Sequence, residues 1–97
     1  MQKFMIERKI PGIGRMKDSE IGAAAGASNK ALAQLAPDVQ WQHSYIAGDK
    51  SFCVYLATDE AAIRKHAEIS GFPADVITRI NKVIDPTTEN QSEAVPA

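Results

Sequence analysis

The sequence predicts an α+β fold whose elements follow the order strand, helix, strand, strand, helix, strand. Apolar residues recur at every second position in four short segments, and at spacings of three and four in two longer ones. Glycine and proline separate these segments. Right-handed strand–helix–strand crossovers would then give a four-stranded antiparallel sheet with both helices on one face, which is the ferredoxin-like arrangement.

The first strand is predicted at Lys3–Ile10, because Phe4 and Ile6 share one side of an alternating pattern. The glycines and proline of the following PGIG sequence end this strand. A helix is predicted over Asp18–Ala36, where small and apolar residues form one continuous face and either of the first two residues can serve as N-cap. Pro37 ends this helix.

The second half of the chain contains a predicted hairpin, a helix and a last strand. Asp38–Asp59 is rich in strand-forming residues on both sides of the tight-turn pair Gly48-Asp49. Thr58–Gly71 is predicted to be the second helix, with an N-cap at its first residue and a glycine stop. Asp75–Ile84 is predicted to be the last strand, although its start is also compatible with a turn of helix.

Length and composition indicate one globular domain. The chain has 97 residues, of which 44% are hydrophobic and 24% are charged. We expect the domain to span residues 1–86 and a disordered tail to occupy residues 87–97, which have little to bury. The net charge of −1 lacks the basic excess of a nucleic-acid-binding protein. A single cysteine, with no signal-peptide pattern and no membrane-length apolar run, favours a cytoplasmic protein that contacts no membrane.

The turn position divides the hairpin residues between two faces. A two-residue turn pairs Tyr45 with Phe52 and would place the more apolar set beneath the helices: Trp41, His43, Tyr45, Phe52, Val54 and Leu56. The more polar set would then lie on the open face: Gln40, Gln42, Ser44, Cys53 and Tyr55. Glu7 of the first strand would join the open face. A three-residue turn would instead pair Tyr45 with Cys53.

Two histidines and one cysteine are a ligand set for a borderline metal such as nickel, copper or zinc. His66, at the border of the apolar stripe of its helix, is expected to approach His43 beneath the sheet, with Tyr45 or Cys53 as further ligands. No diagnostic metal-binding spacing occurs in the sequence. A hydrogen-bonded histidine and a buried apolar cysteine are therefore the alternative interpretation of His66 and Cys53.

The open face suggests a different function. Two sheets packed face to face in a homodimer can enclose a cavity lined by Glu7, Ser44, Cys53 and Tyr55. In an enzyme, Glu7 would serve as general base and Tyr55 would donate to a developing oxyanion. The same cavity would otherwise hold a small molecule. A homodimer without chemistry, in which these side chains only pack, is the third hypothesis.

Three sequence blocks resemble a small bacterial nickel-binding (nickel-responsive) protein family, long described as a domain of unknown function. The blocks are W-x-H-S-Y at Trp41–Tyr45, K-x-F-C-V-Y at Lys50–Tyr55 and H-A-x-x-x-G-F-P-A-D at His66–Asp75, and the resemblance runs from about Phe4 to Thr88. It implies a ferredoxin-like fold, a homodimer, and binding of nickel or another divalent transition metal that the protein would sequester or sense. The matching positions able to ligate a metal are Glu7, His43, Tyr45, Cys53 and His66.

Overall fold

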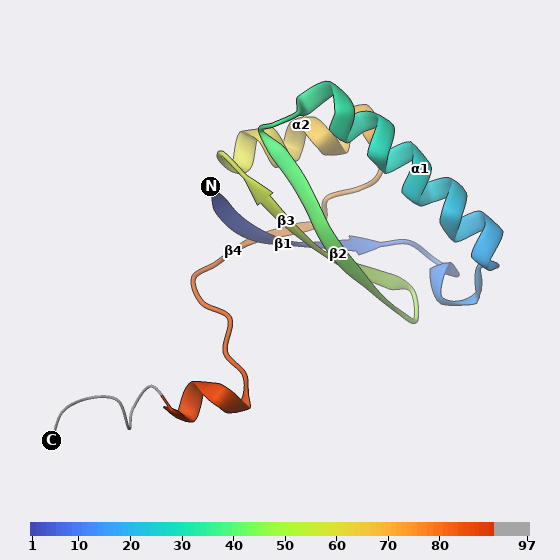
Figure 1. The fold of residues 1–97 in the computed structure, drawn as a ribbon. Helices are drawn as coiled ribbons and strands as arrows, with labels where there is room; N and C mark the ends of the chain where they lie inside the picture. The colour runs from blue at the N-terminus through green and yellow to red at the C-terminus, as the bar shows by residue number, and fades with distance from the viewer. Residues whose placement is uncertain (91–97) are drawn as a thin grey trace, which may run out of the picture.

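Strands and helices follow the predicted order in the structure (Figure 1), a computed structural model that describes residues 1–90. The elements are β1 (Gln2–Lys9), α1 (Asp18–Leu35), β2 (Val39–Ala47), β3 (Lys50–Ala57), α2 (Glu60–Ser70) and β4 (Val76–Ile80), with short 3-10 turns η1 (Ile13–Arg15) and η2 (Pro86–Thr88). The strand order in the sheet is β2-β3-β1-β4, and all neighbouring strands are antiparallel. Both helices lie against the same face of the sheet, so the predicted ferredoxin-like fold is confirmed.

The ends of several elements differ from the prediction. The last strand stops at Ile80 instead of Ile84, because Ile80 already pairs with Lys3 near the start of β1 and little of β1 is left to pair with. The N-cap of α2 is Asp59 instead of Thr58, and its carboxylate accepts a hydrogen bond from the Ala62 amide at 2.9 Å.

The C-terminal segment is only partly described. Residues 86–88 form η2, in which the Asp85 carboxylate accepts a hydrogen bond from the Thr87 amide at 2.8 Å. The remainder of the predicted disordered tail, residues 91–97, lies outside the described residues. Disorder of residues 87–97 therefore stays a prediction. Within residues 1–90, no helix has both the length and the apolar character needed to cross a membrane.

The β2–β3 hairpin has the predicted turn, but most of its side chains lie on the opposite face of the sheet from the predicted one. Tyr45 pairs with Phe52, as predicted, but a bulge between Trp41 and His43 makes Trp41 pair with Tyr55 instead of Leu56. The predicted faces were therefore wrong for His43, Tyr45 and β3, whereas Trp41 lies beneath the helices as predicted because the bulge shifts it. His43, Tyr45 and the β3 residues that share the parity of Phe52 lie on the open face, whereas Trp41, Ser44, Cys53 and Tyr55 face the helices.

The pairing of β1 with β3 explains this reversal. Cys53 pairs with Ile6, and Tyr55 pairs with Phe4. Cross-strand partners point to the same face, and the Phe4 and Ile6 side chains are both buried. The buried core consists of residues from this face and from α2: Phe4, Ile6, Val39, Cys53, Tyr55, Ala57 and Ile63.

The loop after β1 is fastened to the hairpin turn. The amide of Gly14 donates to the carbonyl of Gly48 at 2.8 Å, and the amide of Gly12 donates to the carboxylate of Asp49 at 2.8 Å. A Cβ at Gly14 would lie 2.6 Å from the Gly48 oxygen, so this approach requires glycine. These contacts hold Ile13 over one end of the sheet, where it helps to wall a cavity.

Candidate functional site

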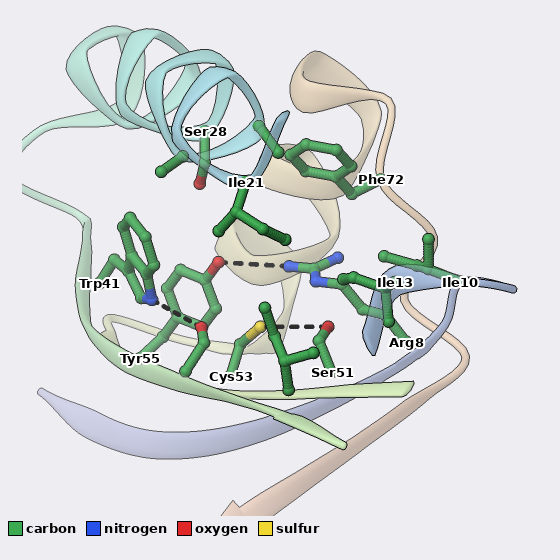
Figure 2. Close-up of a pocket in the computed structure, with 14 residues that line it drawn as sticks. Arg8, Ile10, Ile13, Ile21, Ser28, Trp41, Ser51, Cys53, Tyr55 and Phe72 are labelled. Carbon is green, nitrogen blue, oxygen red and sulfur yellow. Dashed lines mark hydrogen bonds between the residues drawn. The ribbon is translucent and has the colours of Figure 1, made fainter. Parts of the chain in front are cut away.

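A cavity of about 100 Å³ lies between α1, η1 and the helix-covered face of the sheet (Figure 2). The lining residues come from β1, η1, α1, β2, β3 and the segments that follow β1 and α2. Most of them are apolar: Arg8, Ile10, Ile13, Ile21, Ala24, Ala25, Ser28, Trp41, Ser44, Ile46, Ser51, Cys53, Tyr55 and Phe72. Ile46 is 42% exposed, so the cavity reaches the surface along β2. Small residues of α1 leave this space open, because alanine and serine do not fill the gap between helix and sheet.

Arg8 places a positive charge at this cavity. It follows Phe4 and Ile6 on the same side of β1, so its side chain enters the layer between sheet and helices and is only 3% exposed. One terminal nitrogen, Nη1, donates to the carbonyl of Pro73 at 2.5 Å, and Nη2 donates to the hydroxyl of Tyr55 at 3.3 Å. Both acceptors are neutral groups, so neither compensates the charge of the guanidinium.

Tyr55 lies at the inner wall of the cavity. Its side chain is 2% exposed, and its ring lies 6.0 Å from the Arg8 guanidinium carbon. Burial raises the pKa of the Tyr55 phenol, and the nearby Arg8 charge offsets only part of this rise. The phenol is therefore protonated at neutral pH and can both accept and donate hydrogen bonds.

The His66 ring packs next to the Tyr55 ring, and the two ring centroids are 5.2 Å apart. The side chain is 1% exposed, and its Nε2 lies 3.2 Å from the Ser28 hydroxyl of α1. Burial lowers the pKa of His66 to about 4, and the Arg8 charge contributes further in the same direction. At neutral pH the imidazole is therefore uncharged.

Short hydrogen bonds fix the remaining polar groups of the lining. The indole Nε1 of Trp41 donates to the Ser44 hydroxyl at 2.9 Å. The Ser51 hydroxyl and the Cys53 sulfur lie 3.6 Å apart. Among the lining residues described within residues 1–90, Arg8 is the only charged one.

The predicted metal ligands divide between the two faces of the sheet. His43 and Tyr45 lie on the open face, with ring centroids 5.2 Å apart in an edge-to-face contact. Cys53 and His66 are buried on the helix-covered face, so the predicted approach of His66 to His43 beneath the sheet is wrong. Within residues 1–90, no group of three histidine, cysteine or acidic residues is arranged to hold a metal ion. Residues 1–90 of a single chain therefore offer no three-ligand group that fits a nickel ion.

Three of the four residues predicted to line a ligand cavity lie together, although in a different place from the predicted one. Ser44, Cys53 and Tyr55 line one cavity, but this cavity lies beneath the helices and not on the open face. Glu7 pairs with Phe52 on the open face and does not belong to it. Sequence reasoning overlooked Arg8 as a site residue, although its parity with Phe4 and Ile6 was a signal that it points inward.

Comparison with known proteins supplies the family. The crystal structure of SCO4226 from Streptomyces coelicolor A3(2) superposes with a TM-score of 0.70 at 18% sequence identity, covering 84% of this chain and 99% of that chain. This likeness supports the fold. No protein with curated annotation matches the sequence. The family model described as nickel responsive protein SCO4226-like matches residues 4–80, and the chain therefore belongs to the SCO4226-like nickel-responsive protein family.

Proposed function

We propose that the protein binds a small organic molecule in the cavity beneath α1, which we name the Arg8 cavity after its buried charged residue. The observation that carries this proposal is an almost wholly apolar cavity surface whose lining residues include Arg8 and Tyr55, joined by a hydrogen bond. Such a lining is typical of small-molecule sites, where apolar surface supplies affinity and polar groups supply orientation.

The size of the cavity limits the ligand. A cavity of about 100 Å³ is somewhat smaller than the roughly 150 Å³ that holds benzene in an engineered protein core. The exposed side of Ile46 at its edge offers a route for entry, and a ligand can extend past it. We therefore expect a molecule that buries one small ring or a short branched chain.

Filling the cavity tests this proposal. Ala25 lines the cavity, whereas Ala27 lies on the exposed side of the same helix, so Ala25→Phe and Ala27→Phe form a matched pair. Ring-sized fragments are added while the indole N–H signal of Trp41, the sole tryptophan, is followed by NMR. We expect fragment-induced shifts in the wild type and in Ala27→Phe but not in Ala25→Phe. Equal responses in both variants would show that fragments bind elsewhere.

Nickel sequestration or sensing is the second candidate, and the family description favours it. Because one chain offers no three-ligand group within residues 1–90, the metal would have to draw ligands from two copies. His43 is the exposed histidine and lies beside Tyr45 on the open face, whereas His66 is buried. This candidate therefore assigns the metal to His43.

Nickel titration by calorimetry tests this assignment with two matched variants. His43→Gln is expected to weaken nickel binding about tenfold or more, since it removes an imidazole ligand. His66→Gln is expected to leave the affinity unchanged. Loss of affinity in His66→Gln alone would overturn the assignment to His43, and no binding by the wild type would remove nickel as a ligand.

The open face supports a homodimer as part of either function. Phe52 lies on it half-buried, and Tyr45 and Val76 are 58% and 44% exposed. Large apolar side chains on a sheet face that no helix covers are usually covered by a partner, and a second copy is the simplest cover. Sedimentation analysis should find a dimer that Phe52→Lys converts to a monomer and that Ala27→Lys, on the outer side of α1, leaves intact.

The free Cys53 thiol supports a cytoplasmic location.

A further inference from the structure

We propose that the ligand of the Arg8 cavity is a small carboxylate with an apolar body, whose negative head group pairs with the Arg8 guanidinium. The inference rests on the proposed small-molecule function and adds the chemical class of the ligand. It starts from a charge that the protein itself leaves without a counter-ion.

Arg8 is buried without an acidic partner in the part of the chain that the structure describes. Two ion pairs occur there, and both join exposed residues of α2. The partners of Arg8 are instead the Pro73 carbonyl and the Tyr55 hydroxyl. Burying a charge that lacks an opposite charge is unfavourable, so an anion that enters the cavity gains the full attraction of the guanidinium.

The Arg8 guanidinium also has N–H groups beyond those used in its two hydrogen bonds. It carries five N–H groups, and the hydrogen bonds to Pro73 and Tyr55 engage one terminal nitrogen each. The Nε of Arg8 bonds no group within residues 1–90. Arg8 lines the cavity, so this nitrogen belongs to a residue that a ligand in the cavity would contact.

The neighbouring groups strengthen the preference for an anion. Tyr55 accepts a hydrogen bond from Arg8, and its hydroxyl also interacts with Ser28, so a ligand oxygen in the cavity would compete for the same hydroxyl. The Tyr55 phenol and the His66 imidazole are both uncharged at neutral pH, because burial raises the pKa of the first and lowers that of the second. The site therefore holds a single positive charge beside a neutral donor.

The apolar walls of the cavity favour a ligand whose body is also apolar. Ile13, Ile21 and Phe72 cover the space next to Arg8, and none of them can hydrogen-bond a polar body (Figure 2). Inorganic phosphate would leave these walls facing water. A planar carboxylate matches the fork of a guanidinium, and its ring or branched chain would occupy the apolar space.

Binding of an isosteric pair tests the inference. Benzoate and benzamide have nearly the same shape and differ in charge, and inorganic phosphate controls for a site that accepts any anion. Affinities are measured from the Trp41 indole signal by NMR at constant ionic strength. We expect benzoate to bind about tenfold or more tightly than benzamide, and phosphate to cause no shift.

Variants assign the preference to Arg8. Arg8→Gln should abolish the advantage of benzoate over benzamide, and Arg8→Lys should retain part of it. Tyr55→Phe, which removes only the hydroxyl, should weaken benzoate more than benzamide. If Arg8→Gln fails to fold, Arg8→Lys and Tyr55→Phe decide the question by the same ratio.

The outcomes separate the two proposals. Equal binding of benzoate and benzamide in the wild type would overturn the anionic ligand and leave the small-molecule site intact. Tighter binding of phosphate than of benzoate would overturn the apolar carboxylate. If no fragment, charged or neutral, shifts the Trp41 signal, the proposed small-molecule function itself fails.

Discussion

Acid should destabilise this protein through His66 in a pH range where a normal histidine would already be charged. The imidazole is 1% exposed, bonded to Ser28, and has a pKa of about 4 in the folded state, against an ordinary value of 6.5. Because the folded pKa is lowered, the unfolded chain binds the proton first as the pH falls below 6.5. The folded state therefore loses stability from about pH 6.5 down to about pH 4, and His66 contributes no further change below that.

The size of this loss follows from the two pKa values. A difference of roughly two and a half units corresponds to about 3 kcal/mol in full, and to about 2 kcal/mol at pH 5. A domain of this size has a total free energy of unfolding of about 5 to 15 kcal/mol, so the effect is large enough to measure.

Urea denaturation followed by Trp41 fluorescence between pH 7 and pH 5 measures this loss. His66→Gln removes the titrating ring and keeps a group able to bond Ser28, so it should lose about 2 kcal/mol less than the wild type over this range. His43→Gln is the control, because His43 is exposed and its variant should follow the wild type. The three proteins share every carboxylate, so the differences between them isolate the histidines. If the wild type and His66→Gln lose equal stability, His66 titrates normally and the reasoning fails. An NMR titration of the ring checks the folded pKa directly.

Three further substitutions test the packing around the cavity by urea denaturation at pH 7. Gly14→Ala places a Cβ 2.6 Å from the Gly48 carbonyl and should destabilise by about 1 to 3 kcal/mol, while a neutral result would mean that the loop shifts freely. Ser28→Ala removes the hydroxyl partner of the buried His66 and should cost about 1 to 3 kcal/mol, whereas unchanged stability would contradict this bond. Ile6→Ala empties a fully buried position and should cost about 2 to 5 kcal/mol, against less than about 0.5 kcal/mol for the exposed control Lys30→Ala.

The fold could be predicted because its signals are local. Alternation in β1 and helical spacing in α1 each arise within a few residues, and glycine at Gly71 ends α2 with a φ of 78°, as predicted. The end of β4 could not be predicted in the same way. Val83 and Ile84 have strand-forming side chains, but a strand also needs a partner, and β1 begins only one residue before Lys3, the partner of Ile80.

The candidate site depended on a long-range choice that the hairpin pattern could not decide. Both faces of β3 contain large apolar or aromatic residues, with Phe52 and Val54 on one and Tyr55 on the other. Counting apolar residues favoured Phe52 for the helix-covered face, but pairing with Phe4 and Ile6 of β1 placed Tyr55 there.

The two faces of the sheet differ in the kinds of side chain that they carry. The helix-covered layer includes a buried guanidinium, a phenol and several hydroxyls, which stabilise a core less than aliphatic side chains would. Phe52 and Leu56 of β3 lie instead on the face that no helix covers. A buried charge beneath the helices and large apolar side chains on the open face each cost a monomer stability, and both are expected if a second copy covers the open face and a ligand occupies the Arg8 cavity. Loss of the dimer in Phe52→Lys with fragment binding retained would show that the two surfaces serve these purposes independently.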